Sequence, residues 1–357
     1  MSREALHIAG AGPAGLAAAI TAARAGVPTI VHERRATVGA RFHGDFQGLE
    51  NWTRNEDILG EFHRLGIEAT FDYTPFSRLV TYNHDGRERC FDSKEPMFYL
   101  VRRGSSEGTL DQSLKRQALA AGAEIRFNDT VREPKAGSIA AWGPRRSDAI
   151  SVGYLFESDA PDGAYAAASD SLAPKGYSYL LIAGGQGTIA TCMFGSFTDV
   201  KRCVERTVEF FRKKVSFTMR NPRHFGGYGN IYLPKRAVRN GVAYAGEAAG
   251  FQDALWGFGI RSAVVSGCLA AQSVTRGEPA SYESAWRQRL AGHLKSSIVN
   301  RVVYDRMGNR GYDALFARAG RAATVRDWLR KHYATSRLKS TLFGGLRVVG
   351  ERWAKAG

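Results

Sequence analysis

Residues 5–15 read Ala5-Leu6-His7-Ile8-Ala9-Gly10-Ala11-Gly12-Pro13-Ala14-Gly15, an apolar run that leads into three spaced glycines. The alanine-rich segment Leu16–Ala25 follows directly. An apolar run, a glycine turn and a helix-forming segment, in this order, predict the strand, tight turn and helix of a nucleotide-binding unit.

The three glycines have separate roles in such a unit. Gly10 makes the turn off the strand, Gly12 lets a pyrophosphate approach the backbone, and Gly15 lets the helix lie close to the sheet. The N–H groups and the positive dipole end of the helix then face the phosphates. Pro13 suits the first helical turn, where its missing N–H costs little. We therefore expect cofactor contacts from Gly10, Gly12, Pro13, Ala14 and Gly15.

A second predicted strand, Val27–His32, ends at Glu33. A carboxylate in this position of a nucleotide-binding unit binds the two ribose hydroxyls. Glu33 therefore indicates a ribose without a phosphate group, although the adjacent Arg34 and Arg35 weaken that inference. We include Arg34 among the predicted cofactor contacts.

The composition is that of a globular protein, since 44% of the 357 residues are hydrophobic and 24% are charged. This length allows two domains or one large interleaved domain. No segment reads as a membrane span and no signal peptide is evident, so a cytoplasmic protein is expected. The spacing of Cys90, Cys192, Cys203 and Cys268 suits neither a disulfide framework nor zinc, so no metal site is expected.

The net charge of +16 calls for an anionic partner, surface or ligand. No nucleic-acid-binding module is recognisable, so a nucleic-acid partner is not expected. The charge is concentrated in residues 321–357, where nine Lys and Arg oppose two acidic residues and aromatic and Leu side chains are interspersed. This segment is either in peripheral contact with an anionic membrane or a solvated terminal helix packed on the body.

Further helices and strands are predicted from periodicity and turn signals. Arg34–Trp52 reads as a long loop, and Thr53 to Glu56 as a capping box that opens a helix closed by Gly66. Phe217–Pro234 reads as irregular, and the chain past Gly277 as helical. The predicted strands are the hairpin Phe76–Phe91 and Phe98–Arg103, Ala123–Phe127, Ser138–Trp142, Ile150–Glu157, Tyr177–Ala183, Thr188–Phe194 and Val242–Ala245. The predicted helices are Thr109–Ala121, Thr198–Val215 and one that ends near Thr275.

A second glycine-rich stretch reads Gly246-Glu247-Ala248-Ala249-Gly250 and continues as Trp256-Gly257-Phe258-Gly259-Ile260. Together with residues 10–15 and Glu33, it resembles the flavoprotein superfamily that includes geranylgeranyl reductases, flavin-dependent halogenases and aromatic-ring hydroxylases. The resemblance covers most of residues 1–275 and implies noncovalent FAD. Arg102-Arg103, ahead of a predicted helix, is similar to the arginine-then-helix segment that lies near the flavin in this superfamily.

The resemblance also implies roles for the second stretch. The acid after its first glycine, Glu247 here and usually Asp in the superfamily, approaches the ribityl and pyrophosphate region. The later glycines bring a helix N-terminus to the isoalloxazine, where it favours the anionic reduced ring. The FAD contacts implied in this way are Arg41, Phe42, Arg102, Arg103, Gly246, Glu247, Ala248, Gly250, Gly257, Phe258, Gly259 and Ile260.

Within the superfamily, the chain is most similar to the geranylgeranyl-reductase branch through Gly176-Tyr177-Ser178-Tyr179 and residues 248–260. A halogenase would carry Trp-x-Trp-x-Ile-Pro here, and residues 176–182 lack both tryptophans and the proline, which disfavours halogenation. The reductases often have a cysteine in the loop after Glu33. This chain has Arg41-Phe42-His43-Gly44-Asp45 instead, a difference that bears on the reduction of isoprenoid double bonds.

The expected fold is α/β, with a Rossmann-like FAD-binding domain, an interleaved antiparallel β-sheet substrate domain and C-terminal helices. The FAD-binding domain is expected at 1–70, 98–148 and 240–277, the β-rich substrate domain at 71–97 and 149–239, and the basic helical region at 278–357. Since one nucleotide fingerprint is present, NAD(P)H would bind only transiently, or an electron-donor protein would serve.

The resemblance implies an FAD-dependent oxidoreductase, a reductase or dehydrogenase of an apolar, isoprenoid-like small molecule. The first alternative is a flavin-dependent monooxygenase that hydroxylates an aromatic or lipid-like substrate. The second alternative is a flavin-binding interaction protein without turnover.

His43 and Asp45 are the close titratable pair in the loop expected near the flavin. A flavin that passes hydride to carbon often needs a proton donor beside it. An imidazole titrates near neutrality, and a neighbouring carboxylate favours its protonated form. The sequence therefore predicts His43 as the proton donor and Asp45 as its orienting group, with a purely structural His43 as the alternative.

Overall fold

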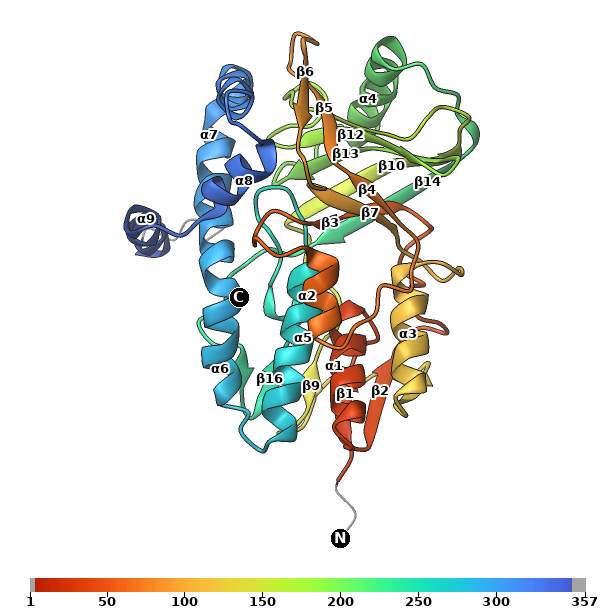
Figure 1. The fold of residues 1–357 in the computed structure, drawn as a ribbon, viewed down its shortest axis with the longest axis vertical. Helices are drawn as coiled ribbons and strands as arrows, with labels where there is room; N and C mark the ends of the chain where they lie inside the picture. Colours follow the sequence, from red (N-terminus) through yellow and green to blue (C-terminus); the bar gives the residue numbers. More distant parts are fainter. Residues whose placement is uncertain (1–3, 349–357) are drawn as a thin grey trace.

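A six-stranded sheet lies at the base of the molecule in the computed structural model, which describes residues 4–348 (Figure 1). Its strands are β1 (Leu6–Ala9), β2 (Thr29–Glu33), β8 (Glu124–Phe127), β9 (Ile139–Ala140), β15 (Val238–Arg239) and β16 (Val242–Tyr244). Their spatial order is β15-β16-β9-β1-β2-β8. All neighbours are parallel except β15 and β16.

Three helices cover one face of this sheet: α1 (Pro13–Arg24), α3 (Leu110–Ala120) and α5 (Ile260–Thr275). Small residues let α1 and α5 approach closely, because a Cβ at Gly267 would lie 2.1 Å from the Ala14 carbonyl oxygen. The alanines and Ile20 in the middle of α1 are fully buried. This packing fixes the first turn of α1 at the end of β1.

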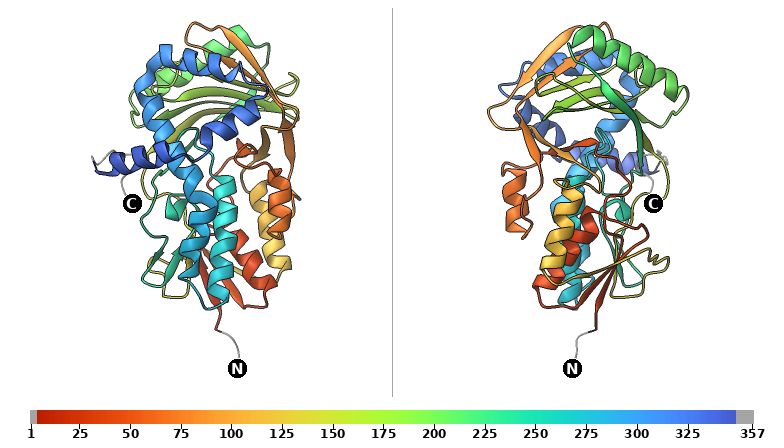
Figure 2. Two further views of the ribbon diagram at one scale, coloured as in Figure 1. Left: turned by 60° about the vertical axis from the view of Figure 1, so that its left-hand side comes forward. Right: turned by 90° about the vertical axis from the view of Figure 1, so that its right-hand side faces the viewer.

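A seven-stranded sheet lies above the α/β layer, and helix α4 (Val200–Lys214) covers its outer face (Figure 2). In spatial order the strands are β14 (Arg220–Gly229), β10 (Ala149–Glu157), β13 (Gln186–Phe194), β12 (Tyr177–Ala183), β11 (Gly163–Ala167), β5 (Arg78–Tyr82) and β6 (Glu88–Asp92). Ser178 of β12 bonds Thr207 of α4 at 2.8 Å. Because side chains alternate along a strand, Tyr177 and Tyr179 point to the opposite, inner face.

A small antiparallel sheet joins the two layers. Its strands are β3 (Phe46–Glu50), β7 (Phe98–Arg102) and β4 (Tyr73–Phe76), with β7 in the middle, and α2 (Ile58–Arg64) follows β3. The Phe46 N–H donates to the Thr188 hydroxyl of β13 at 3.2 Å. The small sheet therefore lies under the inner face of the large one.

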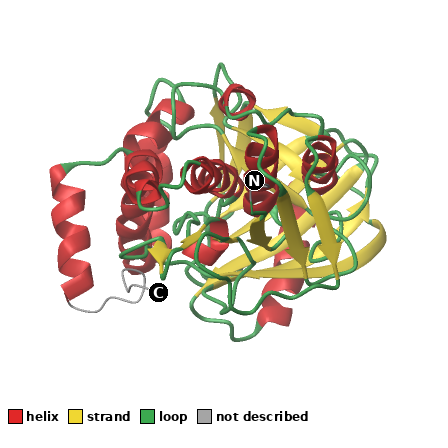
Figure 3. Cartoon of the chain, turned by 90° about the horizontal axis from the view of Figure 1, so that it is seen from below, coloured by secondary structure: helices red, strands yellow, loops and turns green. Residues whose placement is uncertain are grey.

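The C-terminal helices are α6 (Ser281–Trp286), α7 (Gly292–Ala319), α8 (Val325–Tyr333) and α9 (Arg337–Val348). Helix α7 runs along the side of both layers (Figure 1) and breaks at Gly308, where φ is 60° and ψ is −172°. The Tyr304 and Tyr312 rings stack across this break with their centroids 4.2 Å apart. Helix α9 projects from the body (Figure 3).

The predicted fold class is confirmed. Most strands of the six-stranded sheet come from the ranges predicted for the FAD-binding domain, whereas the small sheet combines strands from both predicted domains. The domain boundaries stay a prediction.

Three local predictions are wrong. Helix α2 is capped by Asp57, which accepts the Leu59 N–H at 2.9 Å, and not by Thr53, whose hydroxyl donates to Glu50 at 2.7 Å. The predicted loop Arg34–Trp52 contains β3, and the predicted irregular segment Phe217–Pro234 contains β14. Both strands are stabilised by pairing with distant partners, β7 and β10, which local sequence does not reveal.

Candidate functional site

The first glycine-rich turn has the geometry of a phosphate-binding turn. Gly10 has a φ of +107°, and its N–H donates to the His32 carbonyl at 2.8 Å. A Cβ at Gly15 would lie 1.9 Å from the Gly10 carbonyl oxygen, so this helix start requires glycine. A Cβ at Gly12 would meet nothing within 4 Å. Packing does not require glycine at this position, and the open space suits a pyrophosphate.

Glu33 ends β2 beside this turn. One carboxylate oxygen accepts the Ala11 N–H and the other accepts the Arg35 N–H, both at 2.9 Å. A carboxylate has about four acceptor sites, so capacity remains for two ribose hydroxyls. The adjacent Arg34 is exposed, and it lines the same cavity as Glu33.

Arg103 and Phe42 form one wall of the site. The buried Arg103 guanidinium makes a two-point ion pair with Asp111, at 2.8 and 2.9 Å, and lies 4.2 Å from the centre of the Phe42 ring. Arg41 lies over the same ring at 5.2 Å. Arg102, in contrast, points away and pairs with Asp72 at 2.6 Å, so the structure brings one of the two predicted arginines to the site.

His43 and Asp45 do not form the expected side-chain pair. Asp45 is buried, and its carboxylate accepts the backbone N–H of His43 and the side-chain amide of Gln47, each at 3.0 Å. The His43 side chain is exposed and is not part of the cavity wall, whereas Asp45 is. A catalytic role for either residue stays a prediction.

The start of the second glycine-rich stretch forms a turn next to the cavity, and most of its residues lie behind the cavity wall. The Gly246 N–H donates to the Ser266 hydroxyl at 2.9 Å, and the Ala248 carbonyl accepts the Tyr232 hydroxyl at 2.7 Å. Gly250 closes the turn with a φ of +74°. These three residues support the site without lining it.

Glu247 is the residue of this turn that reaches the cavity. Its carboxylate pairs with the Arg41 guanidinium at 2.9 Å. Burial raises the pKa of Glu247, and the Arg41 charge partly offsets that rise. The ion pair joins the loop after β2 to the second turn.

Residues 257–260 form the start of α5 at the cavity. Gly259 is the N-cap of this helix, and no side chain caps it. The Gly257 carbonyl accepts the Gln252 amide at 2.9 Å, and the Asp253 carboxylate accepts the Trp256 N–H at 2.6 Å. Burial raises the pKa of Asp253 to about 6. The motif did not single out Gln252 and Asp253, although both are polar residues inside the second glycine-rich stretch.

Both turns open into one cavity of about 600 Å³. From the first turn and β2, the predicted residues that line it are Gly10, Gly12, Pro13, Ala14, Glu33 and Arg34. From the later segments they are Arg41, Phe42, Asp45, Arg103, Glu247, Gly257, Phe258, Gly259 and Ile260. Gly15, His43, Arg102, Gly246, Ala248 and Gly250 lie outside the wall.

The far part of the cavity is mainly apolar, and the sequence did not identify its residues individually. The inner face of the large sheet contributes Tyr177, Tyr179, Leu181 and Phe194, and the β5–β6 hairpin contributes Leu79 and Phe91. The C-terminal helices contribute Leu315, Phe316, Trp328 and Leu329. In the sequence, the adjacent apolar residues Leu315-Phe316 and Trp328-Leu329 interrupt otherwise basic helices, and this pattern could have indicated which helix faces point inward.

The residues present fit a dinucleotide flavin. Helices α1 and α5 both begin at glycines without side-chain caps, and both starts open into the same cavity. Uncapped helix N-termini present N–H donors and a positive dipole end to an anion. Glu33 stands beside the first start and an apolar, aromatic wall beside the second, which suits a ribose at one end and a ring system at the other.

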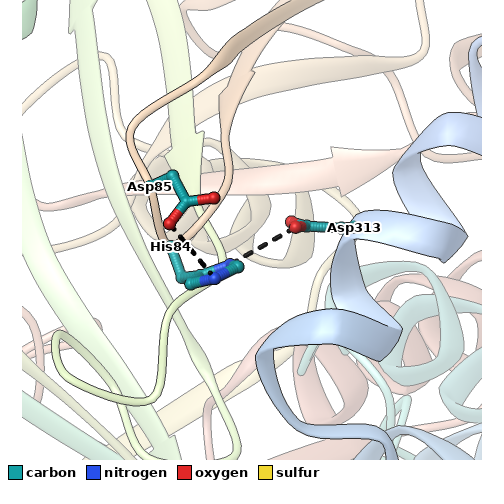
Figure 4. Close-up of side chains that lie close together, drawn as sticks. All are labelled: His84, Asp85 and Asp313. Atoms are coloured by element: carbon teal, nitrogen blue, oxygen red, sulfur yellow. Dashed lines mark ion pairs between the residues drawn. The ribbon is translucent and has the colours of Figure 1, made fainter.

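A His and two Asp side chains come together at the β5–β6 turn, away from this cavity (Figure 4). The Nε2 atom of His84 lies 3.3 Å from Asp85, and its Nδ1 atom lies 3.4 Å from Asp313 of α7. The two acids face opposite nitrogens of the ring, whereas a metal ion would need both acids beside one nitrogen. We read this cluster as a tie between the hairpin and α7.

No family model matches the chain. A digeranylgeranylglycerophospholipid reductase of Methanothermobacter thermautotrophicus is 26% identical over 85% of this chain and 88% of its own length. The corresponding reductase of Haloferax volcanii is 25% identical over 86% of this chain and 87% of its own length. The predicted resemblance to the geranylgeranyl-reductase branch is confirmed by these relatives.

Solved structures share the fold. A geranylgeranyl bacteriochlorophyll reductase-like protein of Thermoplasma acidophilum aligns with a TM-score of 0.73 at 18% identity, over 99% of this chain and 98% of its own. A p-nitrophenol 4-monooxygenase of Pseudomonas putida aligns with a TM-score of 0.69 at 14% identity, over 94% and 99% of the chains. At these identities the likeness concerns the fold alone. Within residues 4–348, no helix has the length and apolarity needed to cross a bilayer.

Proposed function

We propose that this flavin-dependent oxidoreductase is a reductase of an apolar, isoprenoid-like molecule. The observation that carries the proposal is the cavity, into which two uncapped helix starts open and whose wall beside the second start is apolar and aromatic. Reductases of digeranylgeranylglycerophospholipids align along most of the chain. An apolar wall binds a hydrocarbon chain through the burial of apolar surface.

The cofactor in this proposal is FAD. Gly10, Gly12 and the first turn of α1 would hold the pyrophosphate, and Glu33 would hold the adenosine ribose. The start of α5, with Gly257 and Phe258, would hold the flavin ring. When bound, a flavin supplies hydride or electron transfer.

The chain's own residues position these groups and exclude water. The Arg41–Glu247 ion pair, at 2.9 Å, joins the loop after β2 to the second turn on the cavity wall. Arg103 is fixed by Asp111 and supports Phe42 from beneath, so this wall has little freedom to move. Asp45, whose carboxylate is fixed by two N–H donors, is a buried acid on the wall of the site, as is Asp111.

NAD(P)H or an electron-donor protein would reduce the flavin and then leave. The first glycine turn is the one nucleotide fingerprint of the sequence, and the adenosine end of FAD would fill it. A second nucleotide would therefore meet the protein only transiently.

Peripheral contact with an anionic membrane would bring a lipid substrate to the cavity. The described part of the basic tail ends in α9, which exposes Leu338 and Leu342 beside basic residues. Helix α8 of the same tail lines the cavity through Trp328 and Leu329. The remaining basic residues, Arg352 and Lys355, lie outside the described residues.

A monooxygenase is the second candidate, because the structure of a p-nitrophenol 4-monooxygenase shares the fold with a TM-score of 0.69. Substrate-dependent consumption of oxygen, matched mole for mole by hydroxylated product, would favour this candidate. Anaerobic turnover would favour the reductase.

The test is the anaerobic reaction of purified protein with a prenyl substrate. We expect a yellow protein whose reduced flavin is reoxidised by a prenyl lipid, with a product 2 Da heavier for each double bond. The variant Gly12→Val tests the cofactor site. The open space around Gly12 should allow this variant to fold, whereas the valine side chain would block the pyrophosphate. Wild-type FAD content in Gly12→Val, or reduced flavin that prenyl lipids never reoxidise, would contradict the proposal.

A further inference from the structure

Two hydroxyl groups meet on the inner face of the seven-stranded sheet, in the mainly apolar part of the cavity wall. They belong to Ser151 of β10 and Tyr179 of β12, and their oxygens are 2.9 Å apart. We propose that this pair binds an oxygen atom of the substrate, so that the ligand is an oxygenated apolar molecule and not a bare hydrocarbon. The identity of the apolar chain as prenyl rests on the proposed function.

Small residues on the strand between them allow the two hydroxyls to meet. Tyr179 pairs in register with Ala190 of β13, and Ala190 pairs with Gly153 of β10. Because neither neighbour has a large side chain, the Tyr179 ring can extend across β13, where it packs on Ala190. The register therefore holds the phenol beside Ser151.

The pair has a proton to donate. Each hydroxyl carries one proton, and the bond between them uses one of the two. Among the described residues 4–348, neither hydroxyl has a hydrogen-bond partner other than the other hydroxyl of the pair. Burial raises the pKa of Tyr179, so the phenol keeps its proton. One O–H thus remains for an acceptor in the cavity.

The neighbouring strand leaves the pair uncovered. Gly227 of β14 is the register partner of Ser151, and a Cβ there would meet nothing within 4 Å. Phe225 and Leu181 also line the cavity. A hydrocarbon lying here would bury an O–H without a partner, which is costly, whereas a ligand oxygen would satisfy it.

The other polar groups on this face are already committed or weak. The Tyr177 hydroxyl donates to the Trp256 carbonyl at 2.5 Å. Burial raises the pKa of Cys192 to about 12, so it stays a thiol, a weak donor. Since Trp256 belongs to the second glycine-rich stretch, the Ser151–Tyr179 pair would hold the ligand oxygen near the flavin end of the cavity.

The experiment compares ligands that differ only in the oxygen. Flavin-loaded protein is titrated with farnesol and with the C15 hydrocarbon that lacks its hydroxyl, and with 4-dodecylphenol and dodecylbenzene, using the fluorescence of the tryptophans in the cavity wall. We expect wild-type protein to prefer one or both oxygenated ligands by about fivefold to tenfold, the worth of one neutral hydrogen bond. The double variant Ser151→Ala with Tyr179→Phe removes both hydroxyls and should abolish the preference, because hydrocarbons then bind more tightly once no O–H is buried without a partner. Tyr177→Phe should retain the preference.

The two ligand pairs identify the source of the oxygen. A preference confined to farnesol assigns it to a prenyl alcohol, and one confined to the phenol assigns it to an aromatic ring. Equal affinity within both pairs, or an unchanged preference in the folded double variant, overturns the proposal. Should the double variant not fold, Ser151→Ala alone is the second variant and should lower the preference, because Tyr179 loses the partner that orients it. Bound farnesol that reduced flavin does not reduce would contradict the proposed function while the preference remained.

Discussion

Arg41 shows how single side chains join segments that are distant in the sequence. Its guanidinium pairs with Glu247 at 2.9 Å, contacts the Tyr228 carbonyl of β14 and lies over the Phe42 ring. One residue thereby connects the loop after β2, the second glycine-rich turn and the edge of the large sheet. These three elements enclose the part of the cavity where the two glycine-rich turns meet.

Asp253 makes stability depend on pH in a direction that can be tested. Burial raises the pKa of Asp253 from 3.8 to about 6, so the folded protein binds this proton more tightly than the unfolded chain. The stability that the protonated carboxyl contributes is therefore fully present below about pH 4 and is lost as the pH rises through 6. Asn at this position can still accept the Trp256 N–H. From pH 4 to pH 7, we expect the unfolding free energy of wild-type protein to fall relative to Asp253→Asn by up to about 3 kcal/mol. Urea unfolding of flavin-free protein measures this difference, and a constant difference would contradict the assignment.

Residues whose requirements are local were predictable from sequence. Gly10, Gly12, Gly15 and Glu33 each answer a demand of one turn or one strand end, and spacing alone places them. His43 was less predictable, because adjacency in sequence does not determine where a side chain points. Asp45 bonds the backbone of His43, and the imidazole faces solvent.

At the scale of elements, the missed strands share one physical cause. Strand β14 contains Pro222 and three glycines, residues with weak strand preference, and forms because its backbone pairs with β10 at the edge of the sheet. Strand β3 likewise depends on β7. Helices with their own caps, such as α3 with Thr109, were predicted nearly to the residue.

Arg326 anchors α8 to the body. Its buried guanidinium donates to the carbonyls of Asn51, Arg54 and Asn55 and pairs with Glu95. We expect Arg326→Met to cost about 2 to 3 kcal/mol, because charged hydrogen bonds to buried carbonyls are lost. Since α8 lines the cavity, apolar ligands should also bind at least fivefold more weakly.

Urea unfolding and ligand titration measure both effects. Arg337→Met is the matched control, since Arg337 is exposed at the start of α9. Wild-type ligand affinity in Arg326→Met would show that this anchor of α8 does not shape the cavity wall.

At the scale of the whole molecule, the residues that line the far, apolar part of the cavity could not be predicted from the sequence. Its apolar wall combines the β5–β6 hairpin and other strands of the large sheet with two C-terminal helices, segments from Leu79 to Leu329. Their side chains meet only after three sheets and α7 have assembled. The +16 charge and the basic tail were visible from composition, but the inward face of α8 was not.

The surface of α9 leads to the prediction for the membrane. Phe343 is buried and holds the helix to the body, while the exposed fractions of Leu338 and Leu342 are 69% and 47%. Exposed leucines beside basic residues suit an anionic lipid surface, where screening by salt weakens the attraction. We expect the protein to sediment with vesicles that contain anionic lipid and to be released at least fivefold between about 0.05 and 0.5 M salt.

The leucines should matter as well as the charge. The double variant Leu338→Ser with Leu342→Ser should lose most of the vesicle binding, because insertion of apolar side chains adds to the electrostatic attraction. Leu119→Ser is the matched control: this leucine is 46% exposed, but it lies on α3, on the far side of the molecule. Vesicle binding that does not change with salt, or that Leu119→Ser loses as much as the double variant does, would contradict this prediction. It would mean that α9 is a solvated helix and that the lipid substrate reaches the cavity by another route.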